Sequence, residues 1–161
     1  MLRKNPLKGM LSAGFFFVWK GVLPVPIVAP YIAGMGCRSG CSEAELRQLL
    51  ERTLRAHGLL VTDLAGLASV EHKRDEPGLC ALAAVLKLPL AWLPATQLDA
   101  MSDRVSSLST TALQATGAAS VAEASALVQV EALSGKRAAL LIAKHTSAAA
   151  TVAVAGVEES L

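Results

Sequence analysis

The stretch "AGMGCRSGCSEAEL", residues 33–46, joins a glycine-rich turn to the start of an amphipathic segment. The apolar run at 30–33, which can begin as early as Val25, predicts a buried strand that ends at these glycines. Ser42 is followed three residues later by Glu45, which is the spacing of a capping box at a helix N-terminus. The stretch therefore predicts a strand, a tight turn and a helix, the succession typical of layered α/β domains.

Strands and helices alternate along most of the remaining sequence. Leucines at helical spacing predict a helix over 43–57 that Gly58 ends, and Pro77 opens a helix that reaches about Leu86. The other predicted elements are strands at 64–70, 88–93, 138–145 and 150–156, a short helix within 94–109, a second at 110–116, and a helix after Ser120. The last two strands are joined by a link too short for a crossover helix, so they are expected to pair as an antiparallel hairpin. We predict one three-layer α/β/α domain over 30–157, with a mixed sheet of about five strands that ends in this hairpin, and a tail at 158–161.

The charge and the cysteine count argue against two classes of protein, nucleic-acid-binding proteins and disulfide-rich proteins. The 161 residues carry 15 Lys and Arg against 13 Asp and Glu, a formal net charge of +2. No basic run with interleaved aromatic residues occurs, so we expect no nucleic-acid partner. Three cysteines, an odd number, fit reduced intracellular thiols better than a disulfide framework.

Residues 1–29 form an N-terminal extension of different character. Arg3 and Lys4 precede an apolar run from Met10 to Trp19, which is the order found in secretory signals. Lys20 interrupts the run, prolines follow it, and the available cleavage sites are poor. We therefore expect a cytoplasmic protein with an extension outside the domain, and a membrane or export segment is the alternative.

The opening stretch could serve four kinds of site. Cys37 and Cys41 are spaced C-x3-C, which fits neither a zinc pattern nor a C-x-x-C redox pair, so we expect no metal site and no cofactor. Gly34, Gly36 and Gly40 come close to the dinucleotide-binding fingerprint without matching its spacing, and nucleotide binding stays open as an alternative. An anion site needs only a tight turn, the N–H groups of a helix start and a nearby cation. The competing interpretation is a strand-to-helix turn with a solvated arginine.

Cations follow three of the predicted strands. Arg38 follows the first strand, Lys73 and Arg74 follow the second, and Lys144 and His145 follow the fourth. Ligands of open α/β sheets bind beyond the carboxyl ends of the strands. If these strands are parallel, the cations share one edge and suit a ligand with several carboxylates or phosphates, although each could be a solvated surface charge.

Two acidic residues near these cations are candidates for proton transfer. Glu76 follows the second cation pair, and Glu123 lies in the first turn of the helix after Ser120. Glu123 can instead complete a capping box with Ser120, and Glu76 can neutralise its basic neighbours. His72 is better placed for proton transfer than His57, which is expected to be structural, but no nucleophile accompanies His72.

Four segments carry a resemblance to a known family: "AGMGCRSGCSEAEL", "LASVEHKRDEPGL", "GAASVAEASAL" and "LLIAKHTSAAATVAVA". Their order and spacing resemble the CobE and CbiG C-terminal family of cobalamin (vitamin B12) biosynthesis, from about Tyr31 to Ala155. The residues that match the family's motifs are Gly34, Gly36, Cys37, Arg38, Gly40, Lys73, Glu76, Ser120, Glu123 and Lys144. The candidate ligand-binding residues are Gly34, Gly36, Arg38, Gly40, Ser42, Lys73, Ser120 and Lys144, and the candidate catalytic residues are Glu76 and Glu123.

The resemblance implies two possible activities in corrin-ring synthesis. The first is to bind or pass on a polycarboxylate corrinoid (precorrin) intermediate of the aerobic pathway, alone or with other enzymes of that pathway. A cleft with cations at its rim and apolar walls suits a macrocycle fringed with carboxylates. The second is hydrolysis of a (cobalt-)precorrin lactone, as in full-length CbiG, whose N-terminal and central regions this sequence has no room for. In that case Glu123 or Glu76 would be the general base.

Overall fold

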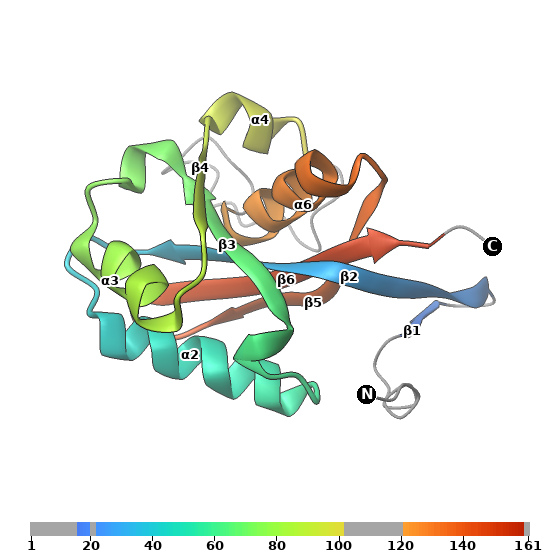
Figure 1. Cartoon of the computed structure of the whole chain (residues 1–161), viewed down its shortest axis with the longest axis horizontal. Helices are drawn as coiled ribbons and strands as arrows, with labels where there is room; N and C mark the ends of the chain where they lie inside the picture. Colours follow the sequence, from blue (N-terminus) through green and yellow to red (C-terminus); the bar gives the residue numbers. More distant parts are fainter. Residues whose placement is uncertain (1–15, 20–21, 102–120, 160–161) are drawn as a thin grey trace.

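The computed structural model describes residues 16–19, 22–101 and 121–159 (Figure 1). Its elements, in chain order, are β1 (Phe16–Trp19), β2 (Val22–Cys37), α2 (Glu43–Ala56), η1 (Val61–Asp63), β3 (Leu64–Val70), η2 (Glu71–Lys73), α3 (Pro77–Leu86), β4 (Leu90–Leu93), α4 (Ala95–Asp99), α6 (Val121–Ser134), β5 (Ala138–Thr146) and β6 (Ala150–Glu158). The predicted alternation of strands and helices is confirmed. The helix predicted at 110–116 and the cap predicted at Ser120 lie outside the described residues.

The strands pair in the order β4-β3-β2-β6-β5, and β1 pairs with β2 outside this order. β2, β3 and β4 run parallel, whereas β6 is antiparallel to both β2 and β5. Two reversals restore the original direction, so β5 runs the same way as β2. The mixed sheet of five strands and its C-terminal antiparallel hairpin are as predicted.

Helices cover both faces of this sheet, which gives the three predicted layers (Figure 1). α2 and α3 lie on one face, where Leu46, Leu49, Leu50 and Leu54 of α2 are at most 1% exposed. α6 packs on the other face together with α4. The helical spacing of the leucines in α2 therefore identified the buried face correctly, and Gly58 ends the helix in a left-handed conformation with φ of 75°.

Strand β2 is longer than predicted and contains two of the glycines that were expected in the turn. It runs from Val22 to Cys37, so Gly34 and Gly36 lie within the strand. A Cβ atom on Gly34 would overlap the carbonyl oxygen of Ala122 in the first turn of α6. Gly34 is thus the residue that lets α6 lie directly on the sheet.

Part of the N-terminal extension is also extended backbone. β1 pairs antiparallel with the beginning of β2, where Phe16 faces Pro26 and Phe17 faces Val25. Over residues 16–19, 22–101 and 121–159, no helix is long and apolar enough to cross a membrane.

Candidate functional site

The carboxyl ends of β2, β3, β4 and β5 meet at one edge of the sheet, because these strands share a direction. Arg38 follows β2, Lys73 ends the 3-10 turn η2 that follows β3, and Lys144 lies two residues before the end of β5. The fourth strand was predicted over 138–145 with Lys144 at its end, and Lys144 lies inside β5, which extends to Thr146. The three cations are spread over the width from β3 to β5, about 14 Å at the usual spacing between strands.

The turn after β2 is held by backbone hydrogen bonds. The N–H of Arg38 donates to the Ala149 carbonyl at 2.8 Å, and the N–H of Cys41 donates to the Arg38 carbonyl at 3.1 Å. Gly40 adopts a left-handed φ of 82°, which glycine adopts without steric cost. These bonds fix the backbone of Arg38 while its side chain remains exposed.

Glu76 anchors the same turn to the start of α3. The residue is only 8% exposed, and its Oε2 accepts a hydrogen bond of 2.6 Å from the N–H of Gly40. A Cβ on Gly78 would overlap the Cys41 carbonyl oxygen, so the turn and the helix are in close contact. The structure therefore gives the Glu76 carboxylate a positioning role in the turn that carries Arg38.

Glu123 has the same relation to Lys144. It is fully buried in the first turn of α6, and its Oε2 accepts a 2.8 Å hydrogen bond from the N–H of Lys144. Between Ile142 and His145, β5 contains one residue more than the facing part of β6, which is a β-bulge. A bulge leaves one residue out of the ladder and redirects the strand, and Glu123 receives a backbone N–H from this segment. Each acidic candidate thus holds the backbone of a segment that carries a candidate cation.

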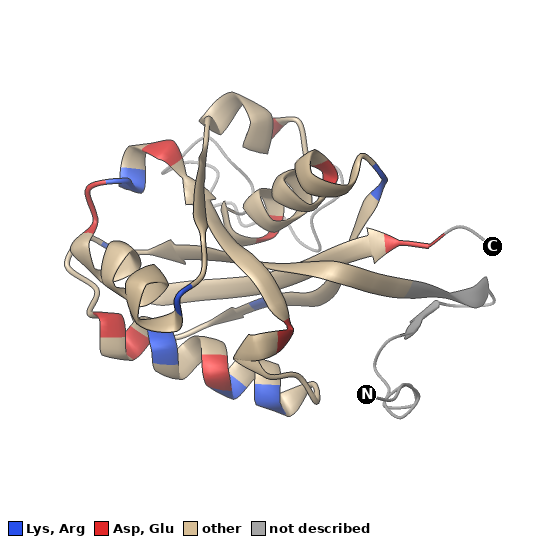
Figure 2. Cartoon of the chain, viewed as in Figure 1, with Lys and Arg blue, Asp and Glu red and all other residues tan. Residues whose placement is uncertain are grey.

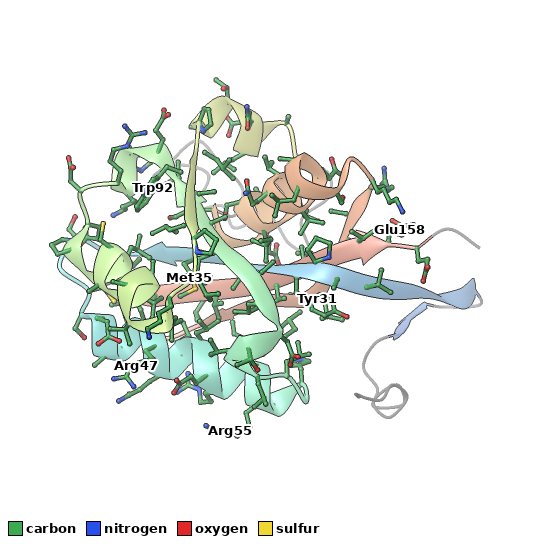
Figure 3. All side chains as sticks on the ribbon, in the orientation of Figure 1. Tyr31, Met35, Arg47, Arg55, Trp92 and Glu158 are labelled. Atoms are coloured by element: carbon green, nitrogen blue, oxygen red, sulfur yellow. The ribbon has the colours of Figure 1, made fainter. Side chains whose placement is uncertain are left out.

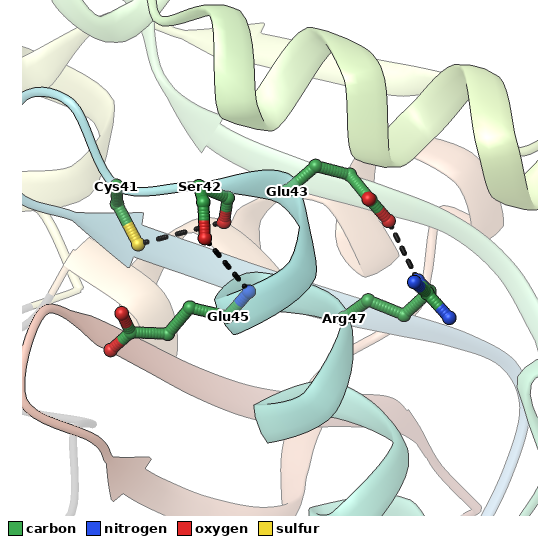
Figure 4. A network of polar contacts seen from close by, with 5 residues as sticks. All are labelled: Cys41, Ser42, Glu43, Glu45 and Arg47. Atoms are coloured by element: carbon green, nitrogen blue, oxygen red, sulfur yellow. Dashed lines mark hydrogen bonds and ion pairs between the residues drawn. The ribbon is translucent and has the colours of Figure 1, made fainter.

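The N-terminus of α2 differs from the predicted capping box (Figure 4). The Ser42 hydroxyl accepts a hydrogen bond of 3.1 Å from the N–H of Glu45, as a cap does. The Glu45 carboxylate turns away from Ser42 and accepts hydrogen bonds from the Ser147 hydroxyl at 2.8 Å and the Ala149 N–H at 3.1 Å. It therefore ties the β5–β6 turn to α2.

The cysteines of the opening stretch are neutral thiols. Burial raises the pKa of Cys37 to about 11, although the nearby Lys73 ammonium opposes the shift. Burial also raises the pKa of Cys41, and Glu45 and Glu76 add to this effect. Cys37, Cys41 and Cys80 are all free. Thiols with raised pKa values are poor nucleophiles and poor metal ligands at neutral pH.

A pocket of about 300 Å³ lies between the beginnings of α2 and α3. It is lined by Gly40, Cys41, Ser42, Glu43, Glu76, Pro77, Gly78 and Ala81. This volume is at the lower limit for small-molecule sites, and none of Arg38, Lys73 and Lys144 is among the lining residues. The pocket lies beside the Arg38 turn and brings together three of the predicted site residues, Gly40, Ser42 and Glu76, but it does not include the three cations.

Gly36 and Arg74, two further residues singled out in the sequence, lie in different environments. Gly36 lies in β2 beneath α6, where an added Cβ would lie at ordinary contact distance from Val121. Arg74 forms an exposed ion pair with Glu71 at 3.6 Å. Figure 2 shows charged residues on α2 and on the segment between β3 and α3, whereas the central strands are almost uncharged. The sheet edge with Arg38, Lys73 and Lys144 therefore borders central strands that carry almost no charged residues.

One contact joins residues that the sequence analysis did not connect. The rings of His57, at the C-terminal cap of α2, and His145, in β5, meet edge to face with centroids 5.6 Å apart. His145 thus turns toward α2, while the backbone N–H of the neighbouring Lys144 is held by α6. No local signal could have paired residues 88 positions apart.

Comparisons with known proteins agree on one family. The family described as "Cobalamin synthesis G C-terminus" matches residues 31–155. Protein CobE of Sinorhizobium sp is 34% identical over 128 residues, which cover 80% of each chain. The crystal structure of CobE, a protein from the cobalamin (vitamin B12) biosynthetic pathway, has a TM-score of 0.76 and 48% identity, and covers 83% of this chain and 97% of that one. Cobalt-precorrin-5A hydrolase of Priestia megaterium is 30% identical over 95 residues, 59% of this chain and only 25% of the hydrolase.

Proposed function

The chain belongs to the CobE and CbiG C-terminal family of cobalamin biosynthesis, and from this membership we propose that it binds a polycarboxylate corrinoid intermediate and passes it to other enzymes of the pathway. The observation that carries the proposal is the common edge of the sheet, to which parallel strands bring Arg38, Lys73 and Lys144. Carboxylates around a macrocycle would meet guanidinium and ammonium groups there, in charge-assisted hydrogen bonds.

The position of the cations favours an open surface as the binding site. The pocket between α2 and α3 is too small for a macrocycle and contains Glu43 and Glu76, which would repel carboxylates. The cations are instead spread along the sheet edge, as suits a wide, flat ligand with charges on opposite sides. Glu76 and Glu123 hold the backbones of the Arg38 turn and the Lys144 bulge, so less conformational entropy would be lost on binding.

A spectroscopic titration tests the proposal. Adding the purified protein to hydrogenobyrinic acid should shift the visible spectrum of the corrinoid to a saturable end point. Arg38→Ala, Lys73→Ala and Lys144→Ala should each weaken the affinity by about tenfold, because each removes a charge-assisted hydrogen bond. Binding should also weaken as the salt concentration rises.

Arg47→Ala and Arg55→Ala are the matched controls, because both arginines project from the outer side of α2 (Figure 3). Both variants should bind as the parent chain does. An unchanged spectrum across late precorrins and hydrogenobyrinic acid, or an equal loss in the α2 controls, would contradict the proposal.

The alternative is hydrolysis of a precorrin lactone, which is supported by the similarity to cobalt-precorrin-5A hydrolase. The chain spans about a quarter of that hydrolase. Glu123 and Glu76 each accept a backbone N–H through Oε2, so a general base would act through the remaining lone pairs of the same carboxylate. If the chain alone opens the lactone, Glu123→Gln and Glu76→Gln distinguish the roles: a base is lost, whereas a positioning acceptor is largely retained.

A further inference from the structure

The contact between His57 and His145 joins the end of α2 to β5, one residue after Lys144, and the proposed function does not use it. The sequence contains three histidines, and two of them meet with ring centroids 5.6 Å apart and ring planes at 75°. Both side chains are exposed to solvent, one at the end of a helix and the other on an edge strand.

The His57 ring is oriented by a backbone carbonyl. Its Nδ1 lies 3.0 Å from the Thr53 carbonyl oxygen. A carbonyl can only accept a hydrogen bond, so Nδ1 carries the proton in this arrangement and the lone pair of Nε2 is free to bind a ligand. Metal-binding histidines are fixed in the same way, through an N–H donated to a carbonyl or a carboxylate.

The separation of the rings also suits a shared ion. Two imidazoles that bind one tetrahedral ion at about 2.0–2.1 Å place their ring centroids roughly 5 Å apart. The observed separation of the centroids, 5.6 Å, is close to this value. We propose that His57 and His145 form a two-ligand site for a divalent first-row transition ion of the Co²⁺ to Zn²⁺ group, with water in the remaining positions.

The electrostatic surroundings favour a cation. His57 caps the C-terminus of the 14-residue helix α2, where the helix dipole and the free carbonyl groups carry partial negative charge. Arg55 in the last turn is exposed, so solvent screens its repulsion. With only two protein ligands the affinity should be moderate, in the micromolar range.

Isothermal titration of the untagged chain with ZnCl₂ at pH 7.5 tests the site. We expect one ion per chain, with His57→Ala and His145→Ala each weakening binding by at least about tenfold, since loss of even an outer-sphere partner costs that much.

His72→Ala is the matched control, since His72 is an exposed histidine on η2, and Cys80→Ser removes the exposed thiol. Both variants should retain full binding, and circular dichroism should show all four variants folded. The site would be refuted if no ion bound more tightly than about 1 mM, or if binding survived both His57→Ala and His145→Ala. Loss of binding in His72→Ala or Cys80→Ser, with the His57 and His145 variants unaffected, would refute it equally. The two rings would then form only an edge-to-face contact.

Discussion

At the scale of single residues, α6 can lie close to the sheet because Gly34 of β2 has no side chain. A Cβ on Gly34 would overlap backbone and side-chain oxygen atoms of Ala122 and Ser125. Gly36, two positions further in the same strand, would place its Cβ 3.8 Å from Val121, an ordinary van der Waals contact. The two glycines resemble each other in the sequence, but only the first is required by packing.

Gly34→Ala should therefore destabilise the fold strongly. Forcing α6 off the sheet or bending β2 is an overpacking defect, and we expect a loss of about 3 kcal/mol in the free energy of unfolding. Gly36→Ala is the control, with an expected change of about 1 kcal/mol or less. Urea unfolding followed by circular dichroism measures both, and equal effects of the two substitutions would show that α6 does not rest on Gly34.

Cys37 gives the stability a dependence on pH. Its pKa rises from 9.0 to about 11 on folding, so the unfolded thiol ionises first. Its contribution is complete below pH 9 and is lost as the pH rises toward 11. The urea midpoint of unfolding should fall over this pH interval. The midpoint of the Cys37→Ser variant should fall less, because serine does not ionise. Burial also raises the pKa of Tyr31, which leaves part of the decline in the variant.

Cys80→Ser serves as the control for this measurement, because the Cys80 side chain is exposed. Its curve of urea midpoint against pH should follow the parent curve. If the urea midpoints of Cys37→Ser and of the parent chain fell equally with pH, the Cys37 thiol would not be the group that causes the pH dependence.

At the scale of elements, the turn between β2 and α2 is held from two sides. Glu76 at the start of α3 accepts the N–H of Gly40, and the β5–β6 turn accepts the N–H of Arg38. Glu45 of α2 holds the same β5–β6 turn through its carboxylate. The turn that carries Arg38 therefore has a fixed backbone before any ligand is bound.

Glu76→Ala should release one side of this turn. The substitution removes a hydrogen bond to a charged acceptor, which typically contributes about 1.5–3 kcal/mol to stability. Glu76→Gln keeps a carbonyl acceptor and should recover most of that loss. Hydrogen exchange of the Gly40 amide reports the release directly. Equal protection of this amide in the alanine variant and the parent would rule out the anchoring role.

At the scale of the whole molecule, the direction of β5 determines which residues can meet. β6 reverses the chain after β5 and lies between β5 and β2, so β5 ends at the same edge as β2, β3 and β4. Lys144 reaches the edge that carries Arg38 and Lys73 only through this arrangement. β1, by contrast, pairs with the start of β2 and lies outside the five-stranded order.

Deletion of residues 1–21 should therefore leave the domain folded. The deletion removes β1 and retains all of β2, whose pairing with β3 begins at Tyr31 and with β6 at Ile27. We expect the free energy of unfolding to change little, because the pairing of β2 with both β3 and β6 is retained. Loss of the cooperative transition would show that β1 belongs to the folding unit.

The sequence by itself determined the local elements and the layered class. Apolar periodicity placed α2 and its buried leucines, Pro77 and Gly58 marked helix boundaries, and a short link required the C-terminal hairpin. These features depend on neighbours within a few residues, which the sequence displays directly. Only the tertiary structure decided that Gly34 belongs to a strand, that Glu76 and Glu123 accept backbone N–H groups, and that His57 meets His145. Each of these depends on the packing of segments that are distant in the sequence. Such contacts produce no periodic pattern of residues, so the sequence alone does not indicate them.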